Sequence, residues 1–275
     1  MVIKEVLEEG RELLRKNNID EREARLLLAY AMGIDFSDLI IKEFCTDEEY
    51  KNFLHYLEER ISGKPYAYIV GYKEFMKLKF KVNSNVLIPR EDTEILAQEV
   101  INEFAKKKDI KILDMCTGSG CIAISLAKYL DITCQVDAVD LSTGAIETAR
   151  ENSILNGVTV NFINSDLFEN VVSKYDVIVS NPPYIKKDDI KNLQAEVKRE
   201  PMMALDGGED GLLFYREIAL KAKGFLVDGG SLVFEIGFDE ANDVSEILKE
   251  NGYEDITVIK DFGGNDRVIK CKTRR

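Results

Sequence analysis

The chain has 275 residues, of which 45% are apolar, and its formal net charge is −13. This length suits one large domain or a large and a small one, and the apolar share suffices for a well-buried core. The acidic charge argues against a protein that depends on neutralising nucleic-acid phosphates, and it suits a basic protein partner better.

The first part of the chain, up to about residue 65, has the apolar spacing of helices. Asp20 followed by Glu23 is typical of a helix start, and Thr46 with Glu49 forms a second predicted capping box. An apolar stripe at helical spacing follows it and is interpreted as core packing: Tyr50, Phe53, Leu54, Leu57 and Ile61. We therefore predict a small helical domain over residues 1–72.

Between residues 74 and 88 the apolar period changes to two. Met76, Leu78, Phe80 and Val82 alternate with lysines, which predicts a half-exposed strand. Residues 83–85 have turn chemistry, and residues 86–88 can return as a second strand. The pattern predicts a β-hairpin linker over residues 73–90.

From residue 91 onward, strands and helices alternate. The predicted strands are 110–115, 134–139, 159–163, 175–180, 231–236, 253–260 and 267–271, and the clearest predicted helices are 121–130 and 142–156. Alternation of this kind predicts an α/β domain over residues 91–275 with a doubly wound, mostly parallel sheet. Ligands bind such sheets beyond the carboxyl ends of the strands, where the winding reverses.

The first of these strands runs into a glycine-containing loop, residues 114–120, directly before a helix. Gly118 and Gly120 allow a tight turn and a close approach of the backbone to a ligand. The next strand ends at Asp140, where an acid can accept hydrogen bonds from both ribose hydroxyls. These features fit an NAD-dependent enzyme and an S-adenosylmethionine-dependent methyltransferase equally well.

Two details favour the methyltransferase. The three-glycine dinucleotide fingerprint is incomplete because Ala123 stands three residues after Gly120, although some fingerprints tolerate alanine. Asp166 follows the third strand, where an acid can bond the adenine amino group. An ordinary loop or helix-cap role is the alternative for this aspartate.

The fourth strand ends in Asn181, Pro182, Pro183 and Tyr184. The prolines end the strand and stiffen the loop, so Asn181 is expected at the carboxyl edge of the sheet. An amide nitrogen is a poor nucleophile, because its lone pair is delocalised into the carbonyl. The Asn181 side-chain oxygen and the Pro182 carbonyl can accept its two N–H groups, and Tyr184 can stack on the flat amide. Methyl transfer then depends on positioning and electrostatics, without a strong general base. A simple turn is the alternative reading.

Residues for metal binding are scarce. His55 is the only histidine, and no two of the five cysteines are spaced as CxxC. This pattern argues against histidine-based triads and structural zinc, and it predicts a reduced protein without a metal. No apolar stretch approaches the roughly 20 residues that span a bilayer, so we expect a cytoplasmic protein without a membrane partner.

Given these motifs, the chain resembles the release factor glutamine methyltransferase family (HemK/PrmC type). The resemblance covers nearly the whole chain. Beyond residues 114–120, Asp140 and 181–184, it includes Gly63-Lys64-Pro65, Leu87-Ile88-Pro89-Arg90 with Thr93-Glu94, Glu200-Pro201 with Ala204-Leu205, Gly208, Asp210-Gly211-Leu212, Glu235-Ile236-Gly237 and Asp266-Arg267. The tetrapeptide alone would be shared with amino-group DNA methyltransferases, whereas the segments 87–94 and 200–205 are more specific to this family.

The resemblance implies a Rossmann-like, seven-stranded class I methyltransferase domain and a five-helix N-terminal domain that helps hold the substrate. It implies that the substrate is the glutamine of the Gly-Gly-Gln motif in peptide chain release factors, so that methylation supports translation termination. No direct nucleic-acid substrate is expected.

The resemblance also implies the site residues. With S-adenosylmethionine as the cofactor and S-adenosylhomocysteine as its product, the expected cofactor contacts, together with the Asp166 inferred above, are Cys116, Thr117, Gly118, Ser119, Gly120, Asp140, Asp166, Leu167 and Asn181. Asn181, Pro182 and Tyr184 are the expected catalytic residues. The expected substrate contacts are Asn181, Pro182, Pro183, Tyr184, Arg90 and Glu94, although Arg90 and Glu94 suit a salt bridge or a helix cap at the domain junction equally well.

One departure from the family pattern and two rival functions remain. Met115-Cys116 stands where the family commonly has Leu-Gly, which places a thiol in the cofactor loop.

An adenine or cytosine amino-methyltransferase would share the chemistry at Asn181, but the acidic charge and the absence of an inserted target-recognition segment disfavour it. A non-catalytic binding module is disfavoured by the intact tetrapeptide.

Overall fold

A computed structural model of the chain describes residues 1–274. These residues form two compact units. Unit 1 comprises Met1–Gly71 and Gln194–Arg199, and unit 2 comprises Tyr72–Leu193 and the chain from Glu200 onward. Within residues 1–274, no helix is both long enough and apolar enough to span a membrane.

Unit 1 is helical. Its elements are α1 (Ile3–Lys16), α2 (Glu23–Ala31), the 3-10 helix η1 (Asp38–Ile41), α3 (Asp47–Ile61), α4 (Tyr66–Val70) and the 3-10 helix η2 (Val197–Arg199). The capping box predicted at Thr46 is confirmed, because its Oγ1 accepts from the Glu49 amide and Glu49 Oε2 accepts from the Thr46 amide. The helix start predicted at Asp20 is wrong in detail. Asp20 accepts from the Arg22 amide in the preceding turn, and α2 begins at Glu23 without a side-chain cap.

A buried arginine joins the two chain segments of unit 1. The Arg60 side chain is 8% exposed and lies 2.6 Å from carboxylate oxygens of both Glu23 and Glu196. A buried cation needs such partners to offset its lost hydration. Unit 1 therefore includes Gln194–Arg199 as well as the N-terminal helices. Arg60 and Glu196 are 136 residues apart in the sequence, so no local sequence pattern predicts their contact.

The hairpin lies earlier in the chain than predicted. Its strands are β1 (Tyr72–Phe75) and β2 (Leu78–Lys81), which pair antiparallel, and the turn falls at Met76 and Lys77. The predicted strand through residues 76–82 with a return at 86–88 is therefore wrong. Met76 and Lys77 adopt φ values of 50° and 60°, which tight hairpin turns require, although neither residue favours them. The Glu94 side chain stabilises the turn by accepting from the Met76 amide at 2.7 Å.

Unit 2 contains the predicted α/β sheet. Its seven strands are β3 (Lys111–Met115), β4 (Gln135–Asp140), β5 (Asn161–Asn164), β6 (Tyr175–Ser180), β7 (Leu226–Glu235), β8 (Glu254–Lys260) and β9 (Asp266–Lys272). They lie in the order β5-β4-β3-β6-β7-β9-β8. The pairs from β5 to β7 are parallel, and β9 runs antiparallel to both of its neighbours. The predicted seven-stranded, mostly parallel fold is confirmed.

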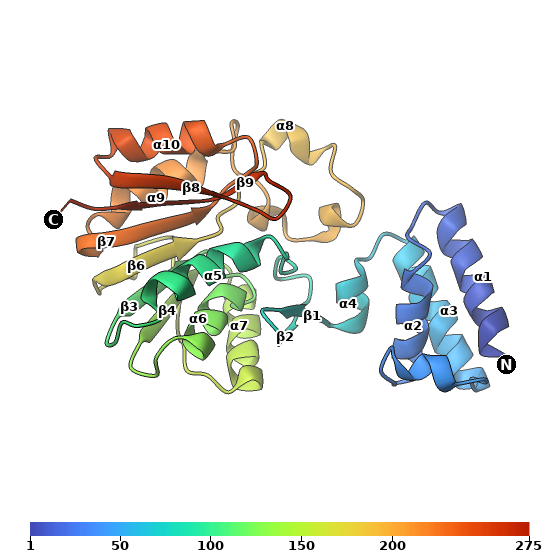
Figure 1. Cartoon of the computed structure of the whole chain (residues 1–275). Coiled ribbons are helices and arrows are strands. Elements are labelled where there is room, and N and C mark those ends of the chain that lie inside the picture. Colours follow the sequence, from blue (N-terminus) through green and yellow to red (C-terminus); the bar gives the residue numbers. More distant parts are fainter. Residues whose placement is uncertain (275) are drawn as a thin grey trace. The chain divides into compact units, whose positions relative to one another are not determined.

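Helices cover both faces of this sheet (Figure 1). They are α5 (Thr93–Phe104), α6 (Cys121–Tyr129) and α7 (Thr143–Asn156) on one face, and α9 (Leu213–Ala222) and α10 (Ala241–Glu250) on the other, while α8 (Lys187–Ile190) and the 3-10 helix η3 (Met202–Ala204) lie in the connection after β6. In β6, Val177 and Val179 belong to the first core and Ile178 to the second. Burial on both faces explains why this strand is a continuous apolar run.

Candidate active site

A cavity of about 340 Å³ lies in unit 2 at the carboxyl ends of β3, β4, β5 and β6. The strand order reverses between β3 and β6, so the cavity occupies the switch point where such sheets bind ligands. Six of the predicted cofactor residues line it: Cys116, Gly118, Asp140, Asp166, Leu167 and Asn181. Its size suits a small organic ligand.

The remaining three predicted cofactor residues, Thr117, Ser119 and Gly120, are buried in the loop and do not line the cavity. They shape the loop instead. The Thr117 hydroxyl donates to the buried Asp114 carboxyl at 2.6 Å. A Cβ at Gly120 would lie 3.0 Å from the Cβ of Ala149, so only glycine lets α6 and α7 pack this closely.

Cys116 and Gly118 form the part of the loop that faces the cavity. Their φ values are 64° and 54°, in the left-handed region that strains any residue except glycine. A Cβ at Gly118 would meet nothing within 4 Å, so this backbone is open to a ligand. Burial raises the pKa of the Cys116 thiol, and nearby Asp140 raises it further. The thiol therefore stays neutral and forms an apolar wall.

Asp140 is already held by the backbone. Its Oδ2 accepts from the Gly118 amide at 2.8 Å, and its Oδ1 accepts from the Ser142 amide at 2.9 Å. Burial raises the pKa of this carboxyl, and the two amides partly offset the effect. Each carboxylate oxygen keeps capacity to accept a second hydrogen bond, so Asp140 can receive two neighbouring hydroxyls.

The rest of the lining suits an adenosine group. Asp166 is exposed at the cavity and offers acceptors for an amino group, while Leu167 is 8% exposed and contributes apolar surface. Further apolar surface comes from residues that the sequence did not single out: Val86, Leu141, Met203 and Phe214. An apolar cavity with two acids in its lining fits a nucleoside.

The tetrapeptide after β6 contributes to two hollows. Asn181 and Pro183 line the cavity described above, whereas Tyr184 lines a second hollow of about 490 Å³ with Arg90. Pro182 is buried. Burial raises the pKa of Tyr184, and the Glu235 carboxyl adds to the effect, so its hydroxyl stays protonated. The tetrapeptide therefore contributes residues both to the nucleoside-sized cavity and to the second hollow.

A glycine-rich segment fixes the tetrapeptide from behind. The Gly207 amide donates to the Ile185 carbonyl at 2.9 Å, and the Ile185 amide donates to the Leu205 carbonyl at 3.0 Å. A Cβ at Gly207 would lie 2.6 Å from Tyr184 Cα, and one at Gly211 would lie 2.5 Å from the Tyr184 carbonyl oxygen. These glycines were missed as site residues, although the run Gly207-Gly208 followed by Gly211 was the available signal.

Arg90 and Glu94 differ in their surroundings. Arg90 forms an ion pair with Glu200, whose carboxylate also accepts from the Ile88 amide, and it lines the second hollow beside Tyr184. Glu94 lines neither hollow, because its carboxylate holds the hairpin turn at Met76. Of this pair, only Arg90 lines a hollow together with a residue of the tetrapeptide.

Two further residues contact the tetrapeptide and were missed. Asn181 Nδ2 donates to Thr93 Oγ1 at 3.2 Å, and the Glu235 side chain is 1% exposed and faces both residues. The sequence contained them only as members of family segments, without a role. Across residues 1–274, no group of three or more His, Cys, Asp or Glu side chains is arranged to hold a metal ion.

Known proteins resemble the chain over both units. Residues 5–71 match the family model of the PrmC N-terminal domain, and residues 90–209 match that of the methyltransferase small domain. The release factor glutamine methyltransferase of Clostridium botulinum is 39% identical over 286 residues, which cover 99% of each chain. The one of Fusobacterium nucleatum is 48% identical over 213 residues, which cover 76% of this chain and 60% of that relative.

A solved methyltransferase from Pyrococcus furiosus superimposes with a TM-score of 0.57 at 21% identity, covering 74% of this chain and 92% of that one. This likeness concerns the fold alone. The full-length match to the clostridial enzyme, together with both family models, decides the membership: the chain belongs to the release factor glutamine methyltransferase family.

Proposed function

We propose that the chain transfers a methyl group from S-adenosylmethionine to the side-chain amide nitrogen of the glutamine in the Gly-Gly-Gln motif of peptide chain release factors, in the cytoplasm. The modification would support translation termination. The proposal rests on the relatives named release factor glutamine methyltransferase and on the chemistry of the site. The single observation that carries it is the tetrapeptide, which contributes Asn181 to a nucleoside-sized cavity and Tyr184 to a second opening.

The cavity residues would hold S-adenosylmethionine. Asp140 would accept from the ribose hydroxyls, Asp166 from the adenine amino group, and the backbone around Gly118 would line the remainder, with Leu167 as an apolar wall. When bound, this cofactor supplies an electrophilic methyl group. The acids and the apolar lining fit its adenosine part, because the ribose hydroxyls and the adenine amino group are donors that the two carboxylates can accept.

The tetrapeptide would hold the glutamine. The Asn181 side-chain oxygen and the Pro182 carbonyl accept the two N–H groups of the substrate amide, which fixes the amide and draws electron density toward nitrogen. Pro183 stiffens the corner, and the Tyr184 ring stacks on the flat amide. Arg90 lies where it can orient the incoming peptide. No base is needed before transfer, since the alkylated nitrogen is acidic and loses its proton readily. Positioning and electrostatics supply the acceleration.

Unit 1 is proposed to take part in binding the protein substrate. The N-terminal helical domain predicted over residues 1–72, of which residues 1–71 lie in unit 1, would help hold the release factor. A net charge of −13 suits a basic protein surface.

Intact-mass analysis tests the proposal. A purified release factor incubated with the chain and S-adenosylmethionine is expected to gain about 14 Da, a methyl replacing a hydrogen, and peptide mapping is expected to place the methyl group on the Gly-Gly-Gln glutamine. A parallel reaction with labelled cofactor and duplex DNA separates the rival function. Label entering DNA at a comparable rate would contradict the protein-directed assignment.

A further inference from the structure

An asparagine can present either an acceptor or a donor to its substrate. Its carboxamide has nearly the same shape when turned by 180°, but the turn exchanges the oxygen for the NH₂ group. In the proposed reaction the substrate amide offers two N–H donors, so only one orientation of Asn181 is productive. The reversed orientation would set two NH₂ groups against each other and would instead favour a carboxylate.

The surroundings of Asn181 distinguish the two orientations. Its Nδ2 donates to the hydroxyl of Thr93 at 3.2 Å, and Thr93 is 2% exposed. Behind this contact lies the carboxyl of Glu235, which is 1% exposed. Burial raises the pKa of Glu235 to about 7, while Thr93, Arg267 and Asn181 favour its charged form and Asp92 opposes it. Glu235 Oε2 has no hydrogen-bond partner within the described chain. In its charged form, which Thr93, Arg267 and Asn181 favour, Glu235 accepts but does not donate, so it attracts the NH₂ side of Asn181 and repels the oxygen side.

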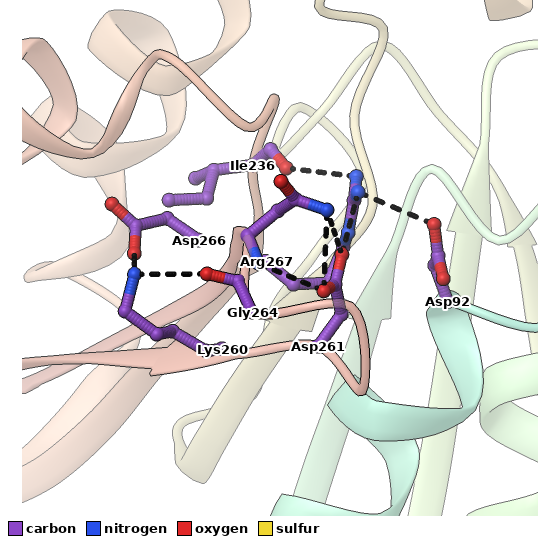
Figure 2. A network of polar contacts seen from close by, with 8 residues as sticks. Asp92, Ile236, Lys260, Asp261, Gly264, Asp266 and Arg267 are labelled. Carbon is purple, nitrogen blue, oxygen red and sulfur yellow. Dashed lines mark hydrogen bonds and ion pairs between the residues drawn. The ribbon is translucent and has the colours of Figure 1, made fainter.

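The two elements that carry Thr93 and Glu235 are fastened together (Figure 2). The guanidinium of Arg267 lies 3.2 Å from the carboxylate of Asp92 and 3.1 Å from that of Asp261, and it also donates to the Ile236 carbonyl at 3.4 Å. Asp92 directly precedes Thr93, and Ile236 directly follows Glu235. The start of α5 is therefore held against the end of β7.

We infer that Glu235 and Thr93 are positioning residues that hold the Asn181 carboxamide with its oxygen toward the substrate, and that they thereby make the site select an amide over a carboxylate. Neither residue lines either of the two hollows, so both act through Asn181. The inference deepens the proposed function and rests on it. Without the two residues, Asn181 is free to turn and to donate to a glutamate placed where the glutamine belongs.

The test compares two release factors, one with its natural glutamine and one in which glutamate replaces it, on five forms of the full chain: wild type, Glu235→Met, Glu235→Gln, Thr93→Val and Thr93→Ser. Methionine and valine keep the volume but remove the polar contact, whereas glutamine and serine keep an acceptor or a hydroxyl. Dissociation constants for both release factors, kcat, KM, S-adenosylhomocysteine affinity and thermal unfolding are measured for each form.

For the wild type we expect at least roughly tenfold tighter binding of the glutamine form than of the glutamate form. Glu235→Met is expected to narrow this ratio severalfold and to lower kcat by roughly tenfold or more, with nearly unchanged S-adenosylhomocysteine affinity. Thr93→Val is expected to lower the selectivity ratio and kcat in the same direction, but to a smaller extent. Glu235→Gln and Thr93→Ser are expected to restore most of the kcat and of the ratio.

The outcomes distinguish a failure of this inference from a failure of the proposed function. A wild-type chain that leaves the release factor unmethylated rejects the proposed function itself. Methylation by the wild type, with Glu235→Met and Thr93→Val folded but unchanged in both kcat and selectivity, overturns only the inference. A purely structural role predicts that kcat follows thermal stability across the variants, whereas a positioning role predicts that kcat in Glu235→Met falls further than its thermal stability accounts for. Should Glu235→Met fail to fold, the comparison of Thr93→Val with Thr93→Ser decides.

Discussion

Asn181 makes two kinds of contact: it lines the nucleoside-sized cavity, and its side-chain amide donates a hydrogen bond to Thr93. Replacing it with alanine removes the acceptor for the substrate N–H but leaves Asp140, Asp166 and the loop at Gly118 in place. We expect Asn181→Ala to bind S-adenosylhomocysteine nearly as the wild type does and to lose about 10²–10⁴ in kcat.

Calorimetry and single-turnover methylation measure these two effects. Asn161→Ala is a matched control, because Asn161 is an exposed asparagine at the start of β5, at the edge of the sheet opposite to the cavity. The control is expected to keep full activity. Wild-type turnover by Asn181→Ala would reject the proposed mechanism.

Asp140 is expected to contribute mainly to cofactor affinity. Both of its oxygens are oriented by backbone amides, so the carboxylate is preorganised before any ligand arrives. Asp140→Ala removes charge-assisted hydrogen bonds to the ribose and releases the Gly118 amide. We expect it to weaken S-adenosylmethionine binding by about 1.5–3 kcal/mol in calorimetry. Asp140→Asn, which keeps one acceptor, is expected to fall in between, and an unchanged affinity in Asp140→Ala would show that the ribose position is misassigned.

At the residue scale, sequence patterns pointed to residues that line the cavity but not to the residues that support them. Asp140 and Asn181 were predictable because each ends a strand of recognisable apolar character. Thr93 lies 88 residues from Asn181 and contacts it only through the fold, so no local pattern could reveal its role. Thr117 and Ser119, which the sequence predicts as cofactor contacts, have buried side chains that do not line the cavity, because successive residues of a tight turn point in different directions.

At the element scale, periodicity predicted the sheet but not the hairpin turn. The central strands of the sheet, β3, β6 and β7, are largely buried on both faces, so their apolar runs are distinct. The hairpin strands have no such continuous apolar run. Met76 and Lys77 continue the alternation of period two while the chain reverses at them, and the contact that supports the turn comes from Glu94 in another element.

The connection after β6 supports the tetrapeptide through close backbone packing, which a glycine substitution can test. Gly211 has a φ of 81°, and an added Cβ would lie 2.5 Å from the Tyr184 carbonyl oxygen and 2.9 Å from Glu240 Oε1. Gly211→Ala is expected to cost about 1–2 kcal/mol from backbone strain and a further ~1–3 kcal/mol from the displaced neighbours. Because the displacement moves Tyr184, methylation is expected to fall more than cofactor binding.

Gly252→Ala is the matched control for this substitution. Gly252 has a similar φ of 75°, but an added Cβ there would meet nothing within 4 Å. It is expected to show only the strain, about 1–2 kcal/mol in urea denaturation, and unchanged kcat. Equal activity losses in both variants would contradict a specific role of the 207–211 segment.

At the scale of the whole molecule, the stability of unit 2 is expected to depend on buried acids. Asp114 is fully buried, and one of its oxygens has no partner within the described chain. Burial raises the pKa of Asp114 from 3.8 to about 7, although Thr117 and the Ala123 amide favour the charged form. Between these two pH values the folded protein binds a proton that the unfolded chain has released. The stabilisation is therefore complete below about pH 4 and is lost as the pH rises toward 7.

Asp114→Asn removes this titration. The free energy of unfolding of the variant, minus that of the wild type, is expected to rise by about 2–3 kcal/mol between pH 5 and pH 8, because only the wild type loses stability from this group. Other buried acids, such as Glu235, are present in both proteins and cancel in the difference. Urea denaturation followed by circular dichroism at several pH values measures it, with Glu246→Gln at an exposed position in α10 as a matched control. A difference for Asp114→Asn that stays level or falls across this range would mean that the carboxyl is charged in the folded protein throughout.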